Sequence, residues 1–133
     1  MKKNLLEAGR GLFRKAGHDL QAAELLLREG ATDVICFHLQ QSVEKYLKAY
    51  LQANAVEFPR THDLDALLDI CASRTEVFED FRDRLEVFIP YAVMLRYEMD
   101  FEPSREEAKT GLVLACEVRD RLAALVPGIS ASD

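Results

Sequence analysis

Apolar residues recur at intervals of three and four along most of this chain, and this spacing constrains the fold more than any other feature. The clearest case is the segment 33–54, in which the apolar side chains share one face of a helix: Ile35, Leu39, Val43, Leu47, Tyr50 and Leu51. No run alternates between apolar and polar residues for long enough to predict a β-strand. The sequence therefore predicts an all-α fold.

The same spacing predicts further helices over residues 5–28, 63–72, 75–97 and 105–125. Pro90 lies inside the third of these segments and is expected to kink or break it. Short loops join the segments, which favours helices that run in alternating directions. We therefore predict an antiparallel up-and-down bundle of about five helices that forms one domain over residues 1–133.

Local signals mark several helix ends. Thr32 or Asp33 is expected to cap the second helix, and Thr61 or Asp63 the third. The sequence from Ser104 to Glu107 matches a capping box, while the tail 129–133 is expected to fray. Glycines at positions 9, 11 and 17 weaken the first helix but allow it to pack closely against a neighbour.

Composition excludes several classes of protein. The net charge of −6, from 17 basic and 23 acidic residues, argues against a protein that coats nucleic acid through bulk electrostatics. The cysteines at 36, 71 and 116 lack CxxC spacing, which predicts free thiols that are buried or half-buried. A signal peptide and an apolar run of ~20 residues are both missing, so we expect a cytoplasmic protein without a membrane segment.

A polar stripe runs along one side of the predicted helix over residues 33–54. Gln41, Lys45 and Lys48 share it with His38, and Gln40, Glu44 and Lys48 form a neighbouring series at i,i+4 spacing. One interpretation is a solvated face with a single Glu44–Lys48 ion pair. The other is a polar groove or subunit interface, where Gln and Lys donors converge on a phosphate or a base. Spacing alone does not separate the two.

Two further polar residues stand out. His62 precedes a helix N-terminus, where it either packs against the bundle or contacts a phosphate together with Arg60. Arg96 follows a mostly apolar run and pairs either with a carboxylate of the fold or with a bound anion. No metal motif accompanies His62, so neither a metal site nor a cofactor is expected.

Four motifs in this order resemble the HEPN family of small helical domains. They are AGHDL at 16–20, CFHLQQSVEKYLKA at 36–49, THDL at 61–64 and RY at 96–97. The resemblance implies a bundle of about five helices, usually a homodimer with a polar cleft near its interface. It also implies a place beside a minimal nucleotidyltransferase, since many such proteins form toxin–antitoxin pairs with one.

Several HEPN branches are metal-independent RNases, in which four to six residues lie between an Arg and the His that follows it. Here the window after Arg96 contains Phe101, Glu102 and Pro103 but no His. The nearest approximation is Arg14 before His18, with only three residues between them. The familiar RNase site is therefore incomplete, and we expect no catalytic residues.

These observations together predict a dimeric HEPN protein that binds a nucleotide or a minimal nucleotidyltransferase. The expected binding residues are Gln41, Lys45, Lys48, His62 and Arg96. Tyr46 and Tyr97 either flank a base or are buried and hydrogen-bonded to the bundle. One alternative is an RNA-cleaving toxin that combines Arg96 with a histidine from elsewhere. The other is a purely structural dimerisation module, in which fixed ion pairs bury the polar stripe.

Overall fold

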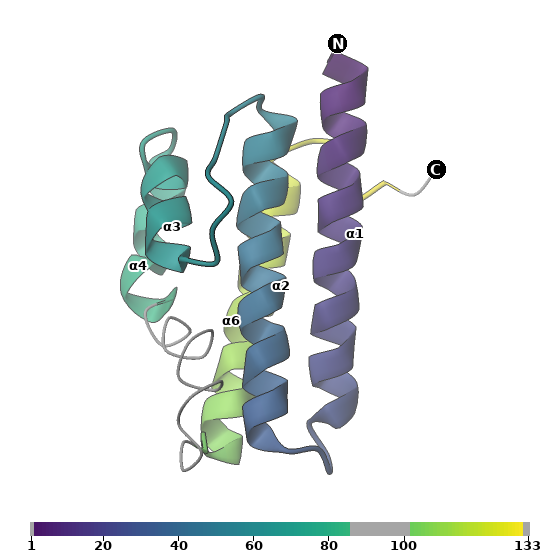
Figure 1. Cartoon of the computed structure of the whole chain (residues 1–133), viewed down its shortest axis with the longest axis vertical. Helices are drawn as coiled ribbons and strands as arrows, with labels where there is room; N and C mark the ends of the chain where they lie inside the picture. The colour runs from purple at the N-terminus through teal and green to yellow at the C-terminus, as the bar shows by residue number, and fades with distance from the viewer. Residues whose placement is uncertain (1, 86–101, 132–133) are drawn as a thin grey trace.

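The three longest helices of the described residues lie side by side, and shorter helices pack on one side of them, away from the first helix (Figure 1). The structure, a computed structural model, describes residues 2–85 and 102–131. Its elements are α1 (Lys2–Leu26), α2 (Thr32–Ala53), α3 (Leu64–Ala72), the 3₁₀ helix η1 (Glu76–Phe78), α4 (Glu79–Leu85) and α6 (Arg105–Leu125). This part of the chain contains no strand, and the predicted all-α bundle is confirmed.

Helices α1 and α2 form an antiparallel hairpin with the largest contact in the bundle (Figure 1). Gly9 permits this close approach, since a Cβ there would lie 2.9 Å from the Ala53 Cβ and 3.1 Å from the Ala49 carbonyl oxygen. Further along the hairpin, the buried Ser42 hydroxyl donates to the Ala16 carbonyl at 2.8 Å. Close packing is therefore confirmed for Gly9, whereas a Cβ at Gly11 would meet nothing within 4 Å.

Helix α6 runs in the same direction as α2, which differs from the expected alternation (Figure 1). Arg105, at the start of α6, donates to the carbonyls of Leu27 and Gly30, in the turn that leads into α2. Beyond the other end of α6, the Gly128 carbonyl accepts from Arg10 Nε at 2.8 Å. Of the three long helices in the described ranges, α2 and α6 therefore start at the same end of the bundle, and α1 runs opposite to them.

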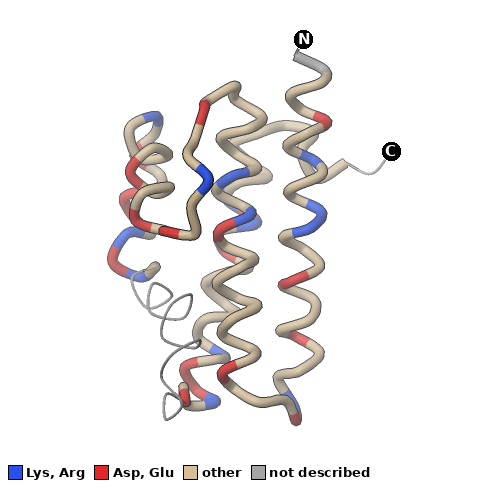
Figure 2. The backbone as a smooth tube through the Cα atoms, in the orientation of Figure 1, with Lys and Arg blue, Asp and Glu red and all other residues tan. Residues whose placement is uncertain are grey.

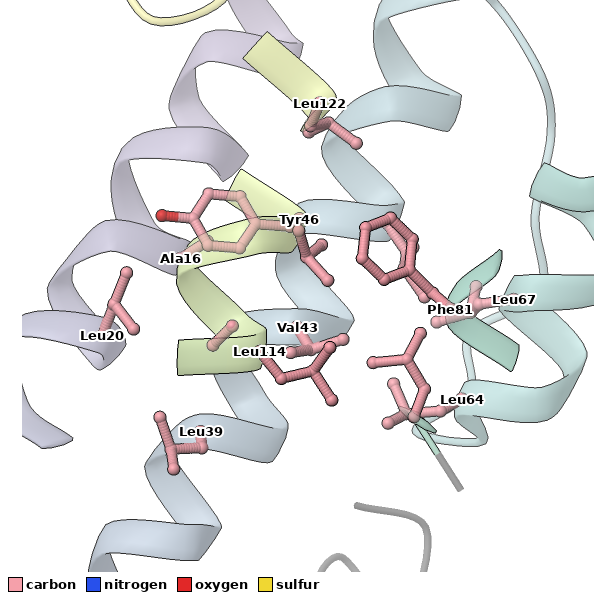
Figure 3. Close-up of a cluster of buried hydrophobic side chains, with 14 of the residues drawn as sticks. Ala16, Leu20, Leu39, Val43, Tyr46, Leu64, Leu67, Phe81, Leu114 and Leu122 are labelled. Carbon is pink, nitrogen blue, oxygen red and sulfur yellow. The ribbon is translucent and has the colours of Figure 1, made fainter. Parts of the chain in front are cut away.

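The core lies between α2 and its neighbours and contains the apolar face predicted for α2 (Figure 3). Tyr46 packs edge-on against Phe13 of α1 with ring centroids 5.0 Å apart, and Tyr50 packs against Phe78 at 4.8 Å. No helix in the described ranges is long and apolar enough to cross a membrane. The largest fully buried side chains are Tyr46, Phe78, Ile35, Leu39, Leu47, Leu51, Leu64, Leu67, Leu68, Leu85 and Leu122.

The helix ends confirm two sequence predictions and correct two others. Asp63 caps α3, and Ser104 with Glu107 forms the predicted capping box of α6. Helix α2 begins after Ala31 without a side-chain cap, so the expected cap at Thr32 or Asp33 is wrong. The tail also differs from expectation at Ile129, which is 1% exposed because the chain turns back over the bundle after α6. Pro90 and the second half of the segment 75–97 lie outside the described residues.

Candidate functional site

A carboxylate from α1 organises the first half of the polar stripe. Asp19 Oδ1 lies 2.9 Å from His38 Nδ1, and Oδ2 lies 2.5 Å from Lys45 Nζ. The Asp19 side chain is 14% exposed and that of Lys45 29%, so the ion pair is only partly accessible to water. Asp19 thus holds two members of the stripe, about two helical turns apart, at the contact between α1 and α2.

A second carboxylate, Glu44, organises the other half. It is 2% exposed, and its Oε1 lies 2.9 Å from His62 Nδ1 while its Oε2 lies 3.3 Å from Lys48 Nζ. The fully buried Gln40 donates to Glu44 Oε1 and to the His62 carbonyl, both at 3.4 Å. Gln41 Nε2 in turn donates to Gln40 Oε1 at 2.8 Å. We call the residues around Asp19 and Glu44 the Asp19 cluster and the Glu44 cluster.

The THDL segment explains how His62 reaches α2. The Asp63 carboxylate accepts from the backbone N–H groups of Asp65 at 3.0 Å and Ala66 at 3.4 Å, which fixes the start of α3. The Thr61 hydroxyl accepts from the Asp63 N–H at 3.0 Å and tightens the turn around His62. A local capping arrangement therefore places the imidazole over Glu44, eighteen positions earlier in the chain.

The two clusters combine equal numbers of carboxylates and lysines, so they carry no net charge while both histidines are neutral. Figure 2 shows acidic and basic positions close together along α2. An ionised carboxylate only accepts hydrogen bonds, so it selects the imidazole tautomer with the proton on Nδ1. The Nε2 atom of His62, on a side chain that is 64% exposed, can then accept a proton or, once protonated, donate to an anion.

Of the five predicted site residues, the structure brings three together around Glu44 and places a fourth, Lys45, in the Asp19 cluster. Lys48 and His62 meet on Glu44, Lys45 belongs to the Asp19 cluster, and Gln41 contacts the Glu44 cluster through Gln40. Arg96 lies outside the described residues, as does the predicted Tyr97. The interpretation of the stripe as a solvated face is wrong for Glu44, although the Glu44–Lys48 pair itself is present at i,i+4.

Sequence reasoning missed the central roles of Asp19 and Glu44. A periodicity signal was available for both: Asp19 lies between the core positions Ala16 and Leu20, and Glu44 directly follows the core residue Val43. An acidic residue at the edge of an apolar helix face must find partners, because an unpaired buried charge is costly. That signal indicates burial but does not identify the partners.

The remaining candidate side chains serve the core. Tyr46 is fully buried, as predicted, but the predicted hydrogen bond to the bundle is wrong, because its hydroxyl has no partner among the described residues. Cys36 and Cys71 are buried and Cys116 is half-buried, as predicted for free thiols. Burial raises the pKa of the Cys71 thiol from 9.0 to about 12 and also raises the pKa of Cys116, so both thiols are poor nucleophiles at neutral pH.

Comparison with known proteins gives one family. The model of the HEPN domain matches residues 10–125, which include Asp19, the whole of α2, the THDL segment and α6. No curated protein matches the sequence. The match therefore covers both clusters and most of the chain.

Proposed function

Because this chain belongs to the HEPN family, we propose that it binds the phosphate groups of a nucleotide, either free or carried by a minimal nucleotidyltransferase partner. The observation that carries the proposal is Glu44, a buried carboxylate that fixes Lys48, His62 and Gln40 around itself. The binding surface comprises Gln41, Lys45, Lys48 and His62, together with Arg96 as a sequence prediction.

Stability alone gives little reason to keep a carboxylate at this position. Burial of a charge is costly, and replacement of both partners of a buried ion pair by hydrophobic residues of similar volume is often neutral or stabilising. A buried acid does, however, hold the groups around it in fixed positions, which lowers the entropy lost when they bind a ligand. Glu44 therefore fits a residue that positions Lys48 and His62.

The exposed parts of the clusters still have donors for a ligand. The Lys45 ammonium carries three N–H donors, and the described contact with Asp19 needs one of them. Protonated His62 offers its Nε2 toward solvent, since its side chain is 64% exposed. The two carboxylates offset the lysine charges, so a bound phosphate gains from directed hydrogen bonds more than from a strong positive field. We accordingly expect modest affinity for a free nucleotide.

The assembly belongs to the same proposal. We infer a homodimer of single-domain chains that operates with a minimal nucleotidyltransferase in a two-gene module of the toxin–antitoxin type. The HEPN membership supports this inference. Light scattering on the purified chain tests the dimer, and a mass of one chain at micromolar concentration would contradict it.

Calorimetric titration with ATP and other nucleotides tests the binding function. We expect saturation at or below millimolar ligand and at least about tenfold weaker binding by His62→Ala, since a charge-assisted hydrogen bond is lost. The matched control is Lys15→Ala, which removes an exposed cation from α1 outside both clusters. If the wild-type protein binds no nucleotide at millimolar concentration, the nucleotide proposal is wrong and the stripe is structural.

A further inference from the structure

A pocket lined in part by Tyr46 lies between α1, α6 and the segment that follows α6. Its volume is about 370 Å³, near the lower end of the ~300–1,000 Å³ range of small-molecule sites. Phe13, Leu20 and Ile129 provide apolar walls, and Arg14 and Arg119 provide cations. None of these residues belongs to the Asp19 or Glu44 cluster.

The Tyr46 hydroxyl is the unusual feature of this pocket. It is buried from solvent, and it has no hydrogen-bond partner in the described part of the protein. Its ring is held edge-on by Phe13, and the hydroxyl points toward α1 (Figure 3). At that point α1 carries Gly17, where even an added Cβ would stay 3.8 Å from the hydroxyl oxygen. The side chain is therefore aimed into the pocket by its packing.

A buried hydroxyl without a partner destabilises the protein, because its hydrogen bonds to water are lost on folding without replacement. Burial also raises the pKa of Tyr46 from 10.0 to about 12, so the group keeps its proton at neutral pH. It is then a donor that lacks an acceptor. A ligand atom with a lone pair, or a water molecule held by the ligand, would supply one.

The rim of the pocket is basic. Arg14 is exposed on α1, one turn before Gly17, and Arg119 approaches from α6, where its Nε donates to Asp120 at 2.9 Å. Arg10 holds the wall that follows α6 through its bond to the Gly128 carbonyl. Glu24 is the acidic residue of the lining, so cations outnumber anions around the opening. Guanidinium groups suit planar or tetrahedral acid groups, which they bind with paired N–H donors.

We propose that this pocket binds a small organic anion with an apolar body. The acid group lies between Arg14 and Arg119, the body packs on Phe13, Leu20 and Ile129, and an acceptor receives the Tyr46 hydrogen. Tyr46 is itself part of the pocket lining, next to the apolar body of the bound molecule. Carboxylates and phosphates share this chemistry, so the test must separate them.

Four simple probes test the proposal on the full chain by NMR titration. Benzoate and phenyl phosphate carry an acid group and a ring, inorganic phosphate lacks the ring, and benzyl alcohol lacks the charge. We expect the two aromatic acids to bind at least about tenfold more tightly than the other two probes, because both parts of the pocket contribute. The stronger of the two identifies the preferred acid group.

Single substitutions test where on the protein the aromatic acids bind. Arg14→Ala should weaken the aromatic acids about tenfold or more, since it removes a charge-assisted contact at an exposed position. Tyr46→Phe should weaken them while raising the melting temperature of the ligand-free protein, because the unpaired hydroxyl is gone. Lys15→Ala and His62→Ala should leave the affinity unchanged, and the latter separates this pocket from the nucleotide surface.

Three results would overturn the inference. The first is that neither aromatic acid saturates the protein at millimolar concentration. The second is that the affinity for the aromatic acids is the same in Arg14→Ala and Tyr46→Phe as in the wild type. The third is a lower melting temperature for ligand-free Tyr46→Phe, which would mean that the hydroxyl already has a stabilising partner. A loss of nucleotide binding in His62→Ala with unchanged benzoate binding would support both sites independently.

Discussion

Replacement of Glu44 by leucine is expected to lower the free energy of unfolding by about 3 kcal/mol. The change keeps the side-chain volume similar but removes the only carboxylate that contacts Lys48 in the described structure, at 3.3 Å. Lys48 is 15% exposed, so its ammonium group cannot fully recover hydration. Gln40, which is fully buried, also loses an acceptor. His62 contributes little to the cost, because its ring can turn to water.

The companion variant Lys48→Met leaves the Glu44 carboxylate with His62 and Gln40, and should cost about 2 kcal/mol. The double variant should cost less than about 1.5 kcal/mol, since no buried charge remains unpaired. A cycle of the four proteins therefore gives a favourable coupling between Glu44 and Lys48 of more than about 3 kcal/mol. The double variant is also expected to fold well and yet lose nucleotide binding.

Urea unfolding followed by circular dichroism at helical wavelengths measures each value, provided that the m-value stays constant. For a domain of this size, 3 kcal/mol corresponds to a fall in melting temperature of roughly 10 °C. Glu7→Leu is the matched control, because Glu7 is an exposed glutamate on α1, and its effect should stay within about 0.5 kcal/mol. A cost below about 1 kcal/mol for Glu44→Leu, or costs that simply add in the double variant, would refute the reasoning.

Three further predictions follow from single contacts. Gly11→Ala should raise the free energy of unfolding by about 0.5–1 kcal/mol. Gly9→Ala should lower it by about 1 kcal/mol or more, because the new Cβ would lie 2.9 Å from Ala53 Cβ. Equal effects of the two variants in urea titrations would contradict this prediction. Tyr46 and Cys71 have pKa values raised to about 12 in the folded protein, so their contribution to the free energy of unfolding is complete below about pH 8 and is lost as the pH rises toward 12. The free energy of unfolding should fall over that range, and Tyr46→Phe should reduce the fall by on the order of 2–3 kcal/mol, whereas an unchanged pH profile would count against the raised pKa of Tyr46. Ser104→Ala should cost about 1 kcal/mol by thermal melting through loss of the capping box, and a neutral result would show that the box contributes nothing.

The helices and their ends were largely predictable because the signals are local. The apolar spacing that marks α2, the Asp63 cap and the Ser104 capping box each depend on residues within about a turn of one another. The direction of α6 was not predictable in this way. It depends on where Arg105 docks, and its acceptors at Leu27 and Gly30 lie more than seventy positions away in the chain.

The candidate site was also predictable only where its contacts are local in the sequence. The polar stripe could be identified from spacing along one helix, and Lys48 with Glu44 follows directly from i,i+4 geometry. The pairing of Asp19 with Lys45 could not be predicted from spacing, because it depends on how α1 is rotated about its axis where it packs against α2. The same limit applies to the Tyr46 hydroxyl, whose lack of a partner depends on Gly17 facing it from α1.

By itself, the sequence determined that this chain forms a helical bundle with an amphipathic α2 and a THDL turn, since these features arise from interactions within a few residues. Only the tertiary structure decided that Glu44 is buried and that the stripe is held by two carboxylates, Asp19 from α1 and Glu44 of α2 itself. The physical reason is that burial and ion pairing depend on which helix faces meet. A helix specifies the residues that share each of its faces, but packing against other helices decides which of those faces remain in contact with water.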